Sequence, residues 1–310
     1  VLIASGAPMP LGADAVIPWT DTDRGESRVT IHHAVAAGDN VRRRAEDVKS
    51  GTTVLTRGSR ISARHVALLA GLGMHRVRVR PAPRVVVVSI GDELVEPGHF
   101  REVGDVFDAN GHALACAVTD AGGQAFRVAA VPDELRALAD TIEDQLVRAD
   151  VLITTGGLSV GQGDTVKDVL APLGSVRFDA VAMSPGRQLG VGTVEGTPIF
   201  CLPGDPVSAQ IAFETFVRPV LRQIAGRTSL HRSSLPATIS EGWHSPSGKR
   251  EFVPVHVSGS PSRGYRAEPT APPGTVRLHG LSEANAIAVV PEDTSTVVAG
   301  DTLHCLLLDA

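Results

Sequence analysis

The sequence is poor in cysteine, in lysine and in long hydrophobic runs, and each shortage excludes a class of protein. Its three cysteines lie far apart without any C-x-x-C pair, which excludes a zinc cluster and a disulfide framework. They are Cys116, Cys201 and Cys305. No run of about 20 apolar residues is present, so no membrane partner is expected. The formal net charge of −5 argues against nucleic acid as a partner, because a general nucleic-acid binder needs a basic face.

The remaining composition is that of a globular protein, with 43% hydrophobic and 20% charged residues. At 310 residues the chain is too long for one ordinary core, so two or three domains are expected. The chain begins without a signal-peptide pattern, and a cytoplasmic location is therefore expected. Lysine occurs only at Lys49, Lys167 and Lys249, which leaves few candidates for a catalytic lysine.

The most informative stretch lies between positions 150 and 168. The apolar run 151–153 predicts a buried strand, and a glycine-rich loop follows it. The small residues of this loop are Gly156, Gly157, Ser159, Gly161 and Gly163. Glycine lets the backbone approach a ligand closely, and successive N–H groups that lead into a helix form an anion site suited to phosphate. Asp164 at the rim of the loop is suited to hold a cation that bridges phosphate oxygens.

Two other predicted strands also end in special loops that carry carboxylates. The run 84–88 leads into S-I-G-D-E-L, and the run 197–202 leads into P-G-D-P-V-S. In an open α/β sheet the loops at the carboxyl ends of the strands line one crevice, where ligands bind. Asp92 and Glu93 are typical of a metal or acid/base pair, although we expect Asp92 to cap a helix after the turn.

Alternating predicted strands and helices from residue 84 to about 226 indicate a mostly parallel sheet with helices on both faces. Residues 1–46 predict short β segments, clearest at 15–18 and 27–32. Ser62 is expected to be the N-cap of a helix that runs to Gly71. From about residue 228 the chain is rich in proline, glycine and serine and ends in short β runs. We therefore expect four regions, at 1–46, 47–82, 83–227 and 228–310.

Five motifs, in chain order, resemble those of the MoeA family, the molybdopterin molybdenumtransferases. They are A-S-G-A-P-M-P-L-G-A-D-A-V-I-P, S-I-G-D-E-L, T-G-G-L-S-V-G-Q-G-D, M-S-P-G-R-Q and L-P-G-D-P-V-S-A. The resemblance covers essentially the whole chain and implies a multidomain α/β protein. Its parts would be a central α/β molybdopterin-binding domain with a mostly parallel sheet, N-terminal β-rich segments that form part of a domain, and a small C-terminal β-barrel. Compared with the family, an N-terminal portion is expected to be absent from this chain.

The resemblance also implies an activity, molybdenum cofactor biosynthesis. The family binds adenylylated molybdopterin, inserts molybdate at its dithiolene and releases AMP. Mg²⁺ is implied as the metal, held by Glu93 and Asp164, and Arg187 would hold an anion. The hydroxyl of Ser5 would donate to a ligand oxygen, although a turn or cap explains this hydroxyl equally well. The family works as a homodimer, in which the partner subunit completes each cleft.

The remaining residues that the resemblance assigns would hold the pterin phosphate and the nucleotide. They are Gly156, Gly157, Ser159, Gly161, Gly204, Asp205, Pro206 and Ser208. The segment V-R-R-R-A-E-D-V-K-S-G resembles the family's R-x-x-G-E-D-x-x-x-G, which places Asp47 near the ligand cleft as a further binding residue.

Departures from the family motifs bear on activity. The chain reads S-P-G-R-Q where the family has K-P-G-K-P, so Ser184 and Arg187 replace the two lysines and Gln188 replaces the second proline. Asp205 replaces the asparagine of L-P-G-N-P and brings a negative charge to a predicted phosphate site. These exchanges favour an alternative, a catalytically impaired paralogue that binds molybdopterin or acts as a scaffold. A second alternative is the molybdopterin adenylyltransferase, but its loop reads G-G-T-G and it lacks flanking β domains.

Overall fold

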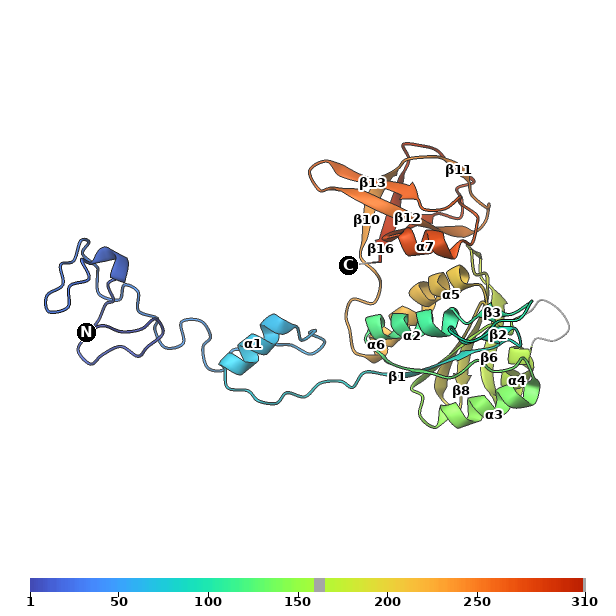
Figure 1. Ribbon diagram of the computed structural model, residues 1–310, viewed down its shortest axis with the longest axis horizontal. Coiled ribbons are helices and arrows are strands. Elements are labelled where there is room, and N and C mark those ends of the chain that lie inside the picture. The colour runs from blue at the N-terminus through green and yellow to red at the C-terminus, as the bar shows by residue number, and fades with distance from the viewer. Residues whose placement is uncertain (159–164, 309–310) are drawn as a thin grey trace. The chain divides into compact units, whose positions relative to one another are not determined.

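The computed structural model describes residues 1–158 and 165–308 and divides into two compact units (Figure 1). The first unit, Val1–Arg57, is described throughout, and none of its residues is buried. Its regular elements are the 3-10 helix η1 (Trp19–Asp21) and an isolated antiparallel bridge between Thr22 and Ile31. The strands predicted at 15–18 and 27–32 are therefore not formed, apart from the single bridge at Ile31. Without a buried face, two short segments have nothing to pack against.

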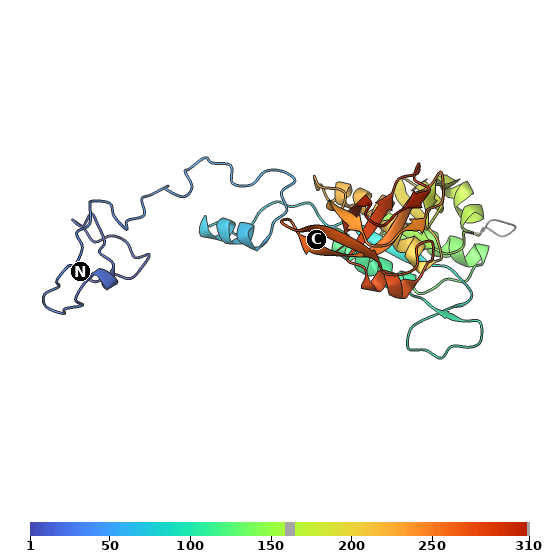
Figure 2. The same ribbon diagram turned by 90° about the horizontal axis from the view of Figure 1, so that it is seen from above.

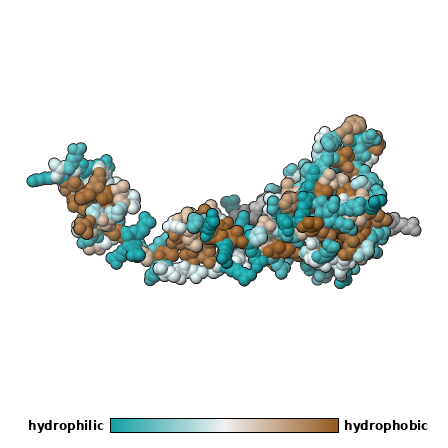
Figure 3. Space-filling view, turned by 90° about the horizontal axis from the view of Figure 1, so that it is seen from below, coloured by the Kyte–Doolittle hydropathy of each residue, from teal (hydrophilic) through white to brown (hydrophobic). Residues whose placement is uncertain are grey.

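The second unit, Gly58–Ala310, opens with helix α1 (Ala63–Gly71). Ser62 caps this helix in a capping box with His65, as predicted, and its backbone N–H donates to His65 Nδ1 at 3.1 Å. Leu69 is the buried residue of α1. Figure 3 shows apolar surface around this helix, where Val66, Leu72 and Met74 are exposed.

A six-stranded sheet in the order β4-β1-β5-β9-β8-β6 forms the centre of the second unit. Its strands are β1 (Arg84–Ser89), β4 (Gln124–Arg127), β5 (Val151–Thr155), β6 (Gly174–Ala180), β8 (Gln188–Val194) and β9 (Thr197–Leu202). Strands β4, β1, β5 and β9 are parallel, whereas β8 runs antiparallel to both of its neighbours, β9 and β6. The prediction of a mostly parallel sheet is confirmed. Strands β1 and β5 are buried on both faces, which explains their uninterrupted apolar runs.

Helices cover both faces of this sheet (Figure 1). They are α2 (Asn110–Ala121), α3 (Leu135–Leu146), α4 (Thr165–Leu173), α5 (Pro206–Ala212), the π-helix η2 (Phe213–Val217) and α6 (Arg218–Ile224). Val85 and Val87 pack with Leu114 of α2 on one face, where α5, η2 and α6 also lie. Val86 packs with Leu138 of α3 on the opposite face, which α4 also covers. Successive β1 side chains thus enter different cores, as the period of two requires.

A long excursion connects β1 to α2 and projects from the sheet (Figure 2). It contains two short parallel strands, β2 (Leu94–Val95) and β3 (Val106–Phe107).

The C-terminal part of the second unit is a closed five-stranded barrel, which confirms the predicted small β-barrel. Its strands are β10 (Ser234–Ile239), β12 (Arg250–Ser260), β13 (Gly264–Pro269), β14 (Ala286–Val290) and β16 (Thr302–Leu307). The order is β13-β10-β16-β14-β12, and pairing of β12 with β13 closes the ring. Strand β7 (Met183–Ser184) pairs with β12 of the barrel. Because β7 belongs to the α/β part of the chain, this pairing connects the two parts. Helix α7 (Leu278–Glu283) and a pair of short strands, β11 (Trp243–His244) and β15 (Thr296–Val297), complete it.

Within the described residues, the helices are all too short or too polar to cross a lipid bilayer.

Candidate functional site

The three predicted loops meet at one edge of the sheet because β1, β5 and β9 are adjacent and parallel there. The Gly156 N–H donates to Leu202 O at 3.3 Å, which joins the loop after β5 to the end of β9. A side-chain carbon at Gly204 would lie 3.5 Å from the Gly156 Cα, so these two loops are in contact. The structure thus brings Gly156, Gly157 and Gly204 together, as predicted.

Gly156 and Gly157 are required by the backbone. Their φ values are +87° and +66°, and a Cβ at Gly156 would lie 2.2 Å from Ile90 O. Glycine alone adopts this conformation without strain and without a clash. The predicted residues Ser159, Gly161, Gly163 and Asp164 lie outside the described residues.

Asp205 has a structural task that the sequence did not reveal. It is the N-cap of α5, and its Oδ1 accepts the Ser208 backbone N–H at 2.8 Å, while Pro206 occupies the first turn. Aspartate and asparagine are equally good N-cap residues. The exchange of the family's asparagine for Asp205 is therefore compatible with the same loop structure.

A buried polar cluster ties this edge together through the first residues of α2. Asn110 Nδ2 donates to Thr155 Oγ1 and to Gly204 O, both at 2.8 Å. The buried carboxylate of Asp108 accepts Ser89 Oγ at 2.9 Å and the Gly111 N–H at 2.8 Å. Sequence reasoning assigned none of these side chains a role. The sequence pattern that contains them is D-x-N-G at the start of a helix. This pattern does not indicate a role until the strand ends that it contacts are known.

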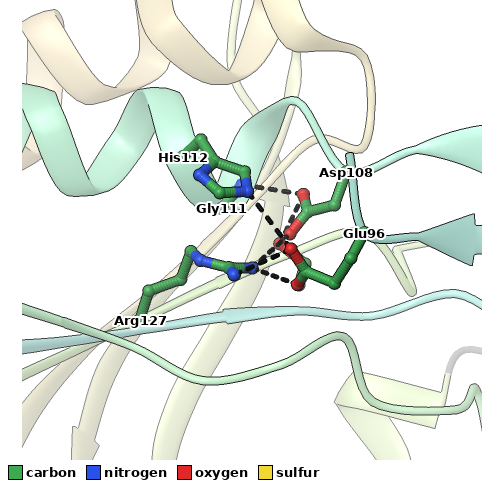
Figure 4. Close-up of polar contacts among 6 residues, drawn as sticks. Glu96, Asp108, Gly111, His112 and Arg127 are labelled. Atoms are coloured by element: carbon green, nitrogen blue, oxygen red, sulfur yellow. Dashed lines mark hydrogen bonds and ion pairs between the residues drawn. The ribbon is translucent and has the colours of Figure 1, made fainter. Parts of the chain in front are cut away.

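Arg127 connects this cluster to the excursion between β1 and α2 (Figure 4). Its guanidinium donates to both Glu96 oxygens, at 2.6 and 2.9 Å, and Nη1 lies 3.3 Å from Asp108 Oδ2. The hydrogen bond from Arg127 lowers the pKa of Glu96, and the same bond raises the pKa of Arg127. His112 Nε2 lies 3.3 Å from Glu96 Oε2. The excursion that carries Glu93 is thereby fastened to β4 and α2.

The acidic pair after β1 divides into two roles. The expectation that Asp92 caps a following helix is wrong, because strand β2 follows at Leu94. Asp92 Oδ1 instead accepts the Asp133 N–H at 3.0 Å and holds the start of the α3 segment. Glu93 is exposed, and its carboxylate lies over Gly91, where a Cβ would be 2.5 Å from Glu93 Oε2.

Few carboxylates at this edge of the sheet are placed where they could hold Mg²⁺. Among the described residues, no group of three or more His, Cys, Asp or Glu is arranged to hold a metal ion. Mg²⁺ commonly uses only one or two protein carboxylates and completes its shell with water and substrate phosphates. The exposed carboxylate of Glu93 suits that kind of site.

The loop with the altered lysine motif lies against the start of α5. A Cβ at Gly186 would be 3.1 Å from Ser208 O, and the preceding Ser184–Pro185 peptide is cis. Arg187 is exposed at the end of this loop. Ser184 and Arg277 are both among the residues that line a small pocket of about 20 Å³, so a barrel residue with a cationic side chain lies in the neighbourhood of the altered motif. Sequence reasoning missed Arg277, because it belongs to a different domain.

Ser5 and Asp47 lie in the first unit, where both side chains are exposed and Ser5 belongs to a turn. Their participation in the same site stays a prediction.

Comparisons with known proteins cover most of the chain. Three family models match: the MoeA N-terminal region (domain I and II) at residues 1–73, a probable molybdopterin binding domain at 86–223, and the MoeA C-terminal region (domain IV) at 236–308. Molybdopterin molybdenumtransferase 2 of Mycobacterium tuberculosis (strain H37Rv) is 38% identical over 97% of this chain and 75% of its own length. Molybdopterin molybdenumtransferase of Bacillus subtilis is 29% identical over 99% of this chain and 73% of its own length.

A solved structure extends the likeness to the fold. The molybdopterin biosynthesis MoeA protein of Pyrococcus horikoshii superposes with a TM-score of 0.79 at 28% identity, over 96% of this chain and 72% of that one. The chain thus spans about three quarters of the relatives it matches.

Proposed function

This chain belongs to the MoeA family, and we propose that it acts as a molybdopterin molybdenumtransferase in molybdenum cofactor biosynthesis. The observation that carries the proposal is the meeting of three loops at the carboxyl edge of the parallel sheet. Two of these loops contain glycines that let their backbones pack closely against the end of β1 and against each other, and the third loop carries Glu93.

The substrate that we propose is adenylylated molybdopterin, which would bind along this edge. Its phosphates would lie against the backbone of the loop at Gly156 and Gly157 and against the loop at Gly204. A backbone with no Cβ can approach phosphate oxygens closely, and its N–H groups supply donors without added charge. Asp205, Pro206 and Ser208 would shape the second loop through the cap of α5.

Molybdate would enter at the same edge, and AMP would leave after its insertion. Both are anions, so the reaction consists mainly of positioning and of neutralising charge on oxygens. Arg187 would hold one of these anions, and we add Arg277 because it lines a pocket with Ser184. Glu93 and Asp164 would hold Mg²⁺, which when bound supplies positive charge between phosphate oxygens.

A catalytically impaired paralogue is the less favoured function. Relatives named as molybdenumtransferases match nearly the whole chain. Asp205 serves as a helix cap, and Arg277 offers a cation near the lost lysine. The exchanges at Asp205 and Ser184 therefore each have a structural counterpart, whereas the structure offers none for Gln188.

We also propose that the protein works as a homodimer, in keeping with the family. The exposed apolar side chains of α1 support an association surface. Light scattering coupled to size exclusion would measure the mass in solution, and a monomer at micromolar concentration would contradict this proposal.

The test of the activity is AMP release from adenylylated molybdopterin, followed with and without molybdate and Mg²⁺. We expect molybdate-dependent release from the wild type, and its loss in Glu93→Ala and Asp164→Ala. Asp140→Ala is the matched control, because Asp140 is an exposed carboxylate on α3. Binding of adenylylated molybdopterin without any AMP release would overturn the transferase and favour the binding paralogue.

A further inference from the structure

One buried amide joins the two ligand loops. Asn110 is 8% exposed, and its Nδ2 donates to Thr155 Oγ1, at the start of the loop after β5. The same nitrogen donates to Gly204 O in the loop after β9. Thr155 Oγ1 in turn donates to Pro203 O at 2.8 Å, so the Thr155 hydroxyl both accepts and donates. These three hydrogen bonds therefore link four residues, Asn110, Thr155, Pro203 and Gly204, across the ends of two strands.

The orientation of this amide follows from its partners. Gly204 O can only accept, so the group that faces it must be the N–H₂ of Asn110. The Oδ1 of Asn110 is left buried and without a partner among the described residues. Leaving a buried acceptor unpaired is unfavourable. The orientation of the Asn110 amide is therefore explained by the two hydrogen bonds that Nδ2 donates, and not by any contact of Oδ1.

The bond to Gly204 also sets the direction of the next peptide group. Because the C=O and N–H of a trans peptide point to opposite sides, the Asp205 N–H is turned away from Asn110. That N–H has no hydrogen-bond partner within residues 1–158 and 165–308.

Asn110 is not needed to start its own helix. Asp108 already accepts the N–H of Gly111, and it is held by Ser89 and Arg127. The two donations of Asn110 both leave α2 and end in the ligand loops.

We propose that Asn110 is a positioning residue, which sets the spacing and the peptide orientation of the two loops that receive the phosphate-bearing substrate. The proposal rests on the proposed function for the identity of that substrate. Asn110 itself is buried and does not touch it.

Asn110→Asp tests this directly, because it keeps the shape of the side chain and replaces the donor with an acceptor. An acceptor would then face Gly204 O and the Thr155 hydroxyl. We expect the Kd for adenylylated molybdopterin, measured without molybdate, to rise about tenfold or more, since two hydrogen bonds are lost. We expect a smaller rise for Asn110→Ala, which removes the bonds without adding repulsion.

The matched control is Asn285→Asp in the barrel. Asn285 also bridges backbone groups, since its Nδ2 donates to Val257 O at 2.9 Å and its Oδ1 accepts the Val257 N–H at 2.7 Å. We expect this variant to lower Tm and to leave the Kd unchanged. A double mutant of Asn110→Ala with Thr155→Val should be less than additive in the logarithm of Kd, because the two residues share a bond.

Hydrogen exchange gives a readout that does not depend on the substrate. In Asn110→Ala we expect faster exchange over residues 151–158 and 200–208, and unchanged exchange over 110–121. Wild-type Kd and wild-type exchange in the Asn110 variants would overturn the positioning role. Faster exchange in those variants, together with no binding by the wild type, would support the clamp and contradict the proposed substrate instead.

Discussion

The α/β part and the barrel of the second unit differ in where they place buried polar side chains. In the α/β part the buried polar or charged residues are Ser89, Asp108, Asn110, Thr154, Thr155, Thr165, Ser208 and Arg218. In the barrel they are Ser245 and Glu251, and its core is otherwise valine, alanine, isoleucine, leucine and cysteine. Several of the first group lie at the ends of β1 and β5 or at the starts of α2 and α5.

The difference follows from how each part is closed. The barrel closes on itself by the pairing of β12 with β13, so backbone hydrogen bonds hold its shape and an apolar core suffices. An open parallel sheet ends in loops that have no ladder, and these must be held by side chains. Buried polar networks of that kind specify one arrangement when they are satisfied. The α/β part accordingly has buried side-chain hydrogen bonds at the strand ends from which its loops begin.

The strongest way to break this contrast is to disturb one loop backbone. Gly156→Ala would force a Cβ to within 2.2 Å of Ile90 O at a φ of +87°. We expect AMP release to fall to about one hundredth of the wild-type rate or lower, since the loop must move. Gly300→Ala in the barrel is the control, because its φ is +99° and a Cβ would meet nothing within 4 Å. Equal activity in the two variants would refute the special place of the β5 loop.

Arg277 is an exception to this difference between the two parts, because it belongs to the barrel and would contribute to the proposed site of the α/β part. We expect Arg277→Ala to raise the molybdate concentration needed for half-maximal AMP release by about tenfold, the effect of losing one charged hydrogen bond. Ser184→Lys in the same background should restore part of this loss, because it returns a lysine to the position where the family motif has one. Arg263→Ala, in the exposed turn between β12 and β13, is the control. An unchanged molybdate requirement in Arg277→Ala alone would contradict the role of Arg277.

Acid should weaken the α/β part through Glu96. The pKa of Glu96 is lowered from 4.5 in the folded protein by its hydrogen bond from Arg127, so the unfolded chain takes up the proton first. This contribution to stability is present above about pH 4.5 and is lost as the pH falls through the lower folded pKa. Thermal unfolding between pH 7 and pH 3 should therefore depend less on pH in Glu96→Gln than in the wild type. Identical pH profiles would show that the ion pair contributes nothing.

The smallest effect on activity is expected from the cysteines, which lie in both the α/β part and the barrel. Cys116 is exposed on α2, whereas Cys201 and Cys305 are buried in the sheet and in the barrel. Burial raises the pKa of the Cys305 thiol to about 11, which suppresses its reactive thiolate. We expect one thiol per chain to react with a disulfide reagent under native conditions, with no loss of AMP release. Cys116→Ser should abolish that reaction, and rapid labelling of two or more thiols would contradict the burial.

The sequence predicted those features that depend on short stretches of chain. The apolar runs of β1 and β5, the alternation of strands and helices and the Ser62 cap all follow from neighbouring residues, whereas the clash that requires glycine at Gly156 comes from the distant Ile90. The motifs in register also indicated the family and the C-terminal barrel. Asp92 was assigned the wrong partner, since its bond to Asp133 crosses 41 positions.

By itself, then, the sequence determined the fold class and the edge of the sheet at which we propose that the substrate binds, because side-chain period and glycine content act locally. Only the tertiary structure decided how that edge is held. Asn110 and Gly204 are 94 positions apart, and Arg127 and Glu96 are 31 apart. No periodicity encodes such pairs, because a buried donor is satisfied by whichever acceptor the packed chain brings to it.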